Sequence, residues 1–167
     1  WQDQSGNGNN LVQATASLQP QYLTGAVNGL PVLRFDGAND NLLFTTRLDS
    51  TVRAVFAVLK QSGAQSWRQF IGDLTADHFS PGSTTLWSSS YASPSVLNGE
   101  TWLNGQPIDG TTTNRPQTMS ILSVLTTGGV TIDRLFSGKS NYPWLGDIAE
   151  LIVYTQPLSS NQRKLIE

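Results

Sequence analysis

The 167-residue chain contains no cysteine, so disulfides cannot stabilise it, and thiol chemistry and thiolate metal sites are excluded. Charged residues are also scarce, at 13% of the chain, and the net charge is only -2. The Lys and Arg residues are spread along the sequence and form no basic stripe that could neutralise phosphates. The composition therefore argues against nucleic acid and anionic membranes as partners.

Long apolar runs are missing as well. Runs such as 52–59 and 148–153 are far shorter than the roughly 20 residues that cross a bilayer, so no membrane insertion is expected. No signal-peptide pattern opens the chain, which begins at Trp1. We therefore expect residues 1–167 to be a single domain excised from a longer protein that is secreted or held at the cell surface. The chain has no Asn-x-Ser/Thr site, which favours a bacterial or phage source.

Turn signals and short β-prone segments are abundant. Four Asn-Gly pairs, the strongest short-range hairpin signal, begin at Asn7, Asn28, Asn98 and Asn104. β-branched and aromatic residues cluster in eight runs, at 30–35, 41–46, 52–59, 69–74, 84–88, 101–103, 119–125 and 148–154. This pattern predicts an all-β fold of two packed antiparallel sheets. Only 158–165, with a Ser cap and a basic end, predicts a short C-terminal helix.

Both ends of the chain contain familiar motifs. The start reads Trp1-x-Asp3-x-Ser5-Gly6-Asn7-Gly8 and then Asn28-Gly29-Leu30-Pro31-Val32-Leu33-Arg34-Phe35-Asp36-Gly37, and it resembles the opening of bacterial laminin G-like, concanavalin A-like lectin domains. The stretch Gly146-Asp147-Ile148-Ala149-Glu150, followed by Pro157-Leu158-Ser159, is similar to that family's closing strand and helix. Trp102-Leu103-Asn104-Gly105 resembles a hairpin of laminin G and pentraxin domains.

The resemblance implies a concanavalin A-like jelly-roll β-sandwich of two antiparallel sheets. That architecture is shared by lectins, carbohydrate-binding modules, adhesion domains and some polysaccharide-cleaving enzymes, so it does not fix the function. Large apolar residues within the matching motifs are expected to be core or corner residues. They are Trp1, Phe35, Ile148 and Leu158.

Residues that could carry out catalysis are few. Glycoside hydrolysis uses two carboxyl groups that flank the scissile bond, and the chain has three glutamates in all. The nearest pair, Asp147 and Glu150, is separated by three positions, which puts the two side chains on opposite faces of a strand. The single histidine, His78, has no nucleophile turn of the G-x-S-x-G type with it. We expect a non-catalytic domain, with a polysaccharide lyase or glycoside hydrolase as an alternative.

Aromatic residues in polar loops are the main candidate binding groups. They are Trp144, Tyr142, Trp87, Tyr91 and Trp67. Flat rings stack on the C–H faces of sugars, and the segment 141–144 is the first choice because Pro143 stiffens it. The alternative for each ring is to fold back into the core. The sequence thus predicts a lectin-like module that binds a polysaccharide or other glycan, with a structural or protein-binding module, such as a phage tail or adhesin domain, as the alternative.

Calcium is the other ligand that the resemblance implies. Asp36, Asp40 and Asn41 lie in one polar loop, and the pair Asp40-Asn41 resembles the start of the pentraxin calcium site. The acidic cluster that completes that site has no counterpart at 134–139. We expect one structural calcium ion at most. The alternative is a turn whose Asp and Asn side chains cap their own backbone.

Overall fold

The computed structural model describes residues 1–63, 66–136 and 138–167. Antiparallel strands dominate these residues, together with a short C-terminal helix, so the all-β prediction is confirmed. The strands are β1 (Leu11–Val12), β2 (Gln21–Val27), β3 (Leu30–Asp36), β4 (Leu42–Gln61), β5 (Ile71–Gly72), β6 (Glu100–Leu103), β7 (Gln106–Ile108), β8 (Ser120–Leu135) and β9 (Leu145–Tyr154). The helical elements are a 3-10 turn at Ala16–Leu18, α1 (Pro94–Leu97) and α2 (Ser160–Ile166).

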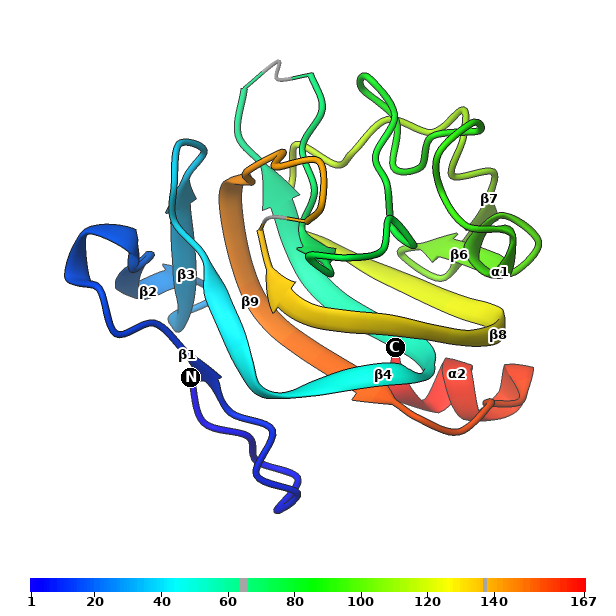
Figure 1. The fold of residues 1–167 in the computed structure, drawn as a ribbon, viewed down its shortest axis with the longest axis horizontal. Helices are drawn as coiled ribbons and strands as arrows, with labels where there is room; N and C mark the ends of the chain where they lie inside the picture. The colour runs from blue at the N-terminus through cyan, green and yellow to red at the C-terminus, as the bar shows by residue number, and fades with distance from the viewer. Residues whose placement is uncertain (64–65, 137) are drawn as a thin grey trace.

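One hydrogen-bonded path runs β2-β3-β9-β4-β8-β6-β7, with β1 also beside β4 and β5 beside β8. The long strands β4 and β8 pair from Leu42 opposite Leu135 to Leu59 opposite Ser120, with three shifts of register between. Both strands turn back on themselves at one end of the molecule (Figure 1). The sheet is thereby folded into two facing layers, which gives the molecule a sandwich-like character.

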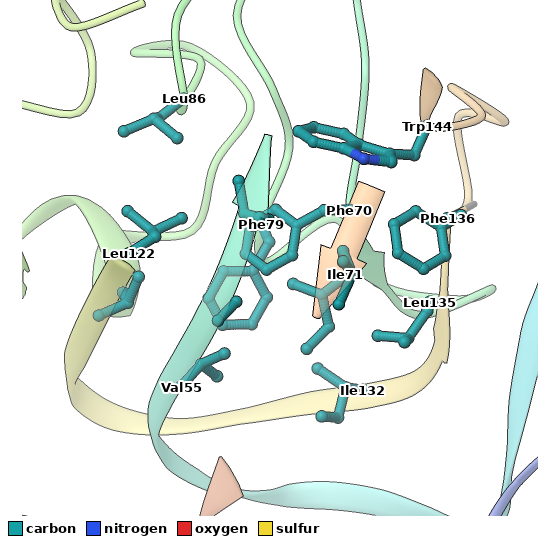
Figure 2. Packing of buried hydrophobic residues seen from close by; sticks show 14 of the residues in the cluster. Val55, Phe70, Ile71, Phe79, Leu86, Leu122, Ile132, Leu135, Phe136 and Trp144 are labelled. Atoms are coloured by element: carbon teal, nitrogen blue, oxygen red, sulfur yellow. The ribbon is translucent and has the colours of Figure 1, made fainter. Parts of the chain in front are cut away.

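The core lies between these layers. Val55 and Leu122 reach it from one half of the paired strands, and Ile132 and Leu135 from the other half (Figure 2). Phe35 and Ile148 are fully buried, as predicted, and Leu158 is half-buried. Trp1 was expected in the core or at a corner, but 42% of it is exposed, and the residues that follow it form a loop that projects beyond the strands before β1 begins (Figure 1).

The segment between β5 and β6 is mostly irregular. The predicted strand at 84–88 is absent; only Thr85 forms an isolated bridge, with Asn114. The reason is a buried guanidinium: Arg115 donates to the backbone carbonyls of Gly82, Ser83 and Thr85. Those carbonyls satisfy the arginine instead of a neighbouring strand, so this segment wraps around Arg115.

The helix α2 covers part of the outer face of the sheet. Its Arg163 is buried, lies 3.6 Å from the centre of the Trp102 ring on β6, and pairs with Glu167. Contact with a ring face and with a carboxylate offsets the loss of solvation of the guanidinium. Among the described residues, no helix is long and apolar enough to cross a membrane.

Candidate functional site

Two of the five predicted binding aromatics lie together. The rings of Trp67 and Tyr142 stack with their centres 5.5 Å apart and their planes at 29°, and both side chains are partly exposed. The backbone is strained in both loops that carry the pair, since φ is 57° at Trp67 itself and 48° at Asn141, which precedes Tyr142. A positive φ in a residue with a side chain persists only where surrounding contacts hold it.

Arg68 supplies those contacts. Its Nη1 donates to the carbonyls of Gly37 and Pro143, each at 2.6 Å, and burial lowers the pKa of its guanidinium. The backbone N–H of Gln69 also donates to the carbonyl of Tyr142 at 2.9 Å. Gly37 is needed here, because its φ is 76° and a Cβ would lie 2.7 Å from Cβ of Leu145. The loops at 36–41, 66–69 and 141–144 are thus tied into one unit.

Trp144 and Trp87 are core residues, which corrects the prediction that they display their rings. Trp144 is 0% exposed and packs against Phe70 and Phe136 at 6.1 and 6.2 Å between ring centres (Figure 2). Trp87 is 3% exposed, and its indole N–H donates to Thr101. Rings buried this deeply cannot stack on a sugar.

Tyr91 is the most exposed of the five predicted rings, at 67%. It follows a tight turn in which the Ser88 hydroxyl accepts from its backbone N–H. Within the described residues its ring belongs to no aromatic pair, so Tyr91 is not part of the Trp67–Tyr142 unit.

The loop with the predicted calcium ligands is an Asx-type turn. Asp36 Oδ1 accepts from the backbone N–H of Ala38, and Asp40 Oδ2 accepts from the N–H of Asp36. Asn41 Oδ1 accepts from the side chain of Gln13. No group of three or more His, Cys, Asp or Glu residues gathers as a metal site in residues 1–63, 66–136 or 138–167. A calcium ion bound at Asp36, Asp40 and Asn41 stays a prediction.

The two acidic residues considered for catalysis lie in different environments. Asp147 is buried and faces two cations, Arg34 at 2.7 Å and Lys60 at 3.3 Å, whereas Glu150 is exposed. Burial opposes the charge of Asp147, but the hydrogen bonds from these two cations outweigh it, so its pKa is lowered. A carboxylate held ionised in this way cannot serve as a general acid at neutral pH.

His78 is half-buried, and burial lowers its pKa, so the ring is neutral at pH 7. The carboxylate of Asp73 opposes that shift from nearby, yet both of its oxygens are bound by Arg47. Asp73 is therefore not free to orient His78 in the manner of a catalytic triad.

A cleft of about 640 Å³ was not predicted from the sequence. It lies between the N-terminal segment, including Trp1 and Asp3, and the second half of β9 from Ala149 onward. Phe44 and Leu48 of β4 also line it. The only sequence signal for this cleft was the aromatic residue at position 1. Whether the Trp1 side chain is exposed depends on the path of residues 1–9, which the sequence does not reveal.

Comparison with protein families, with curated proteins and with solved structures gives no match to this chain. Its function is therefore inferred from its own residues and geometry.

Proposed function

We propose that this chain is a non-catalytic carbohydrate-binding module that holds a polysaccharide or other glycan against the Trp67–Tyr142 ring pair. The observation that carries the proposal is the stack itself, two partly exposed rings with centres 5.5 Å apart on loops that Arg68 ties together. Ring faces bind the C–H surfaces of sugars. Because the loops are already fixed, little conformational entropy is lost on binding.

Polar groups next to the rings complete the requirements of a sugar site. Asn141 and Ser66 are exposed and directly flank Tyr142 and Trp67 in the sequence. An amide can donate to one sugar hydroxyl while accepting from another, and a serine hydroxyl can do the same. This combination of a flat apolar surface with a few polar groups is typical of ligand sites that select by orientation.

The proposal extends to the architecture and its setting. The facing layers would be a concanavalin A-like jelly roll, in a secreted or surface protein of bacterial or phage origin. Support comes from the two Asn-Gly pairs of the resemblance, since Asn28-Gly29 and Asn104-Gly105 all have φ between 51° and 80°. Those values are typical of the tight turn that closes a two-residue hairpin. A structural calcium ion at Asp36, Asp40 and Asn41 would stiffen the loop beside the ring pair.

Absence of catalysis is also part of the proposal. Its support is that Asp147 is neutralised by Arg34 and Lys60, and that Asp73 is bound by Arg47. The alternative of a lyase or hydrolase predicts new reducing ends when the protein is incubated with polysaccharides. A reducing-end assay that rises with time and with enzyme concentration would overturn the non-catalytic proposal.

Isothermal titration against a panel of soluble neutral and acidic polysaccharides tests the binding itself. Trp67→Ala and Tyr142→Ala are each expected to weaken binding about tenfold or more, which corresponds to about 1.4 kcal/mol of lost stacking. Tyr91→Ala is the matched control, because it removes an exposed loop tyrosine outside the ring pair. If no polysaccharide binds the unaltered protein, or if Tyr91→Ala weakens binding while Trp67→Ala does not, the proposal is wrong.

A further inference from the structure

The second half of β9 has an open edge. β3 pairs with β9 only from Leu33 opposite Ile148 to Asp36 opposite Leu145. In the same register Pro31 would face Glu150, and proline has no N–H to donate. Pairing between β4 and β9 also skips Ala149 at an irregularity, which twists the strand there. From Ala149 onward β9 is therefore paired with β4 on one side, and no strand of the described residues pairs with it on the other.

The cleft runs along this open edge. Every residue from Ala149 to Gln156 lines it. Side chains alternate between the two faces of a strand, so an unbroken run of lining residues means that the cleft meets the strand edge-on. Residues 1–9 form most of the opposite wall. Backbone N–H and C=O groups of β9 thus face an open slot rather than a neighbouring strand.

The slot has the size and surface that suit an extended chain. Residues 149–154 of β9 offer an edge of roughly 20 Å, at about 3.3 Å per residue. Phe44 and Leu48 on one layer and Leu151 and Val153 on the other pack against the core and also line the cleft. Trp1, with 42% of its surface exposed, also lines the cleft. Alternate apolar side chains of an added strand would be buried against these lining residues.

The charged side chains that line the cleft are both acidic, and the N-terminal ammonium of Trp1 donates to the carbonyl of Leu11 at 2.8 Å. The acidic side chains belong to Asp3 and Glu150, and among the described residues no Lys or Arg lines the cleft. Hydrogen bonds from the Ser5 side chain and from the backbone of Ser5 and Asn9 lower the pKa of Asp3, so its carboxylate is ionised at neutral pH. A ligand with a basic group is favoured over one with an acidic group.

We propose that this cleft is a docking slot for an extended segment of a partner protein that carries Lys or Arg and adds as a strand beside β9. Backbone hydrogen bonds to the open edge of β9 provide the affinity, and the apolar residues of the cleft contact alternate side chains of the segment. Asp3 and Glu150 select the basic residue. The slot is separate from the Trp67–Tyr142 pair and does not depend on glycan binding.

Fluorescence anisotropy with a labelled peptide, Thr-Val-Lys-Val-Thr-Val, tests this proposal. Saturable binding is expected. Binding should be at least tenfold weaker when the Lys of the peptide is replaced by Glu. It should be lost when alternate backbone nitrogens of the peptide are N-methylated, because N-methylation blocks strand pairing and keeps the side chains. Trp1→Ala should weaken binding of both the Lys peptide and the Glu peptide. Glu150→Gln should reduce the preference for Lys over Glu, while Tyr91→Ala should change nothing.

Amide hydrogen exchange separates strand addition from simple adhesion. The amides of residues 150–154 that face the cleft should exchange quickly in the free protein and slowly with the peptide bound. Trp67→Ala should bind the peptide normally, so failure of glycan binding leaves this result unaffected. Equal binding of the N-methylated peptide, displacement of the peptide by an oligosaccharide, or a dimer in sedimentation that protects the same amides would each overturn the proposal.

Discussion

Tyr142 and Trp144 lie two positions apart, yet one ring is partly exposed and the other is buried. Tyr142 stacks outward on Trp67, whereas Trp144 enters the core between Phe70 and Phe136. Pro143 between them has its carbonyl fixed by Arg68, which holds the chain so that one ring faces solvent and the other faces the core. A loop composition alone does not distinguish these two rings, because the partners that decide their burial are distant in the sequence.

Replacement of Trp144 tests its structural role. Trp144→Ala removes a side chain that is 0% exposed, so the free energy of unfolding should fall by roughly 3–5 kcal/mol. Urea denaturation followed by circular dichroism measures this change. Tyr91→Ala, at 67% exposure, should stay within about 0.5 kcal/mol of the unaltered protein. Comparable losses in the two variants would contradict the burial of Trp144.

Asp73 makes stability depend on acid. Burial opposes its charge, but hydrogen bonds from Arg47 and Thr75 outweigh burial and lower its pKa well below the ordinary value of 3.8. Its folded-state pKa is depressed, so its contribution is complete above pH 4 and is lost as pH falls below the unfolded value. Denaturation at pH 7, 4 and 2.5 should show that the free energy of unfolding decreases as the pH falls. The decrease should be smaller in Asp73→Asn than in the unaltered protein. An equal slope in both proteins would refute this role.

Strands were predicted well where alternation and turn residues agreed, as at 30–35, 101–103 and 148–154. β4 was predicted as two strands, 41–46 and 52–59, because the polar residues near Ser50 read as a break; Ser50, with φ of 53°, instead bends one continuous strand. Only 119–125 of β8 was predicted, since Gly128-Gly129 resembles a turn. β2 was missed because its side chains are mostly exposed and show no apolar face.

The helix α2 has a matched pair of caps at its start. The Ser159 hydroxyl accepts from the backbone N–H of Gln162, and the Gln162 side chain accepts from the backbone N–H of Ser159. Ser159→Ala should therefore lower the free energy of unfolding by about 1 kcal/mol. Thermal denaturation measures this loss, and Ser160→Ala, one residue into the helix, is the control that should have little effect. A larger loss in the control would show that the cap is not what stabilises this end.

The fold of the whole molecule depends on the bend shared by β4 and β8. A Cβ on Gly129 would lie 1.9 Å from the backbone oxygen of Ser50, so Gly129→Ala forces the two strands apart at the bend. We expect a loss of roughly 1–3 kcal/mol in chemical denaturation. At Gly128 an added Cβ meets only the end of the Ser95 side chain, at 3.0 Å, so Gly128→Ala should cost less. The reverse order would contradict the close approach at Gly129.

The candidate site could be predicted only in part, since it depends on this global arrangement. The sequence nominated Trp67 and Tyr142 as ring residues, but their stacking requires loops 75 positions apart to meet across Arg68. The cleft beside β9 needs an even longer-range event, the separation of β3 from β9 after Ile148. Pro31 is a local signal that pairing of β3 can stop, but the sequence does not show that its partner there is β9.

The most direct measurement is a ¹H–¹⁵N spectrum of the five tryptophan indoles during titration with the soluble polysaccharide that binds best in the panel. Glycan binding at the ring pair predicts that the Trp67 indole shifts, while the buried Trp87 and Trp144 indoles and the Trp1 indole at the peptide cleft do not. A Trp67 signal that stays fixed at saturating polysaccharide, or shifts confined to Trp1, would contradict the account.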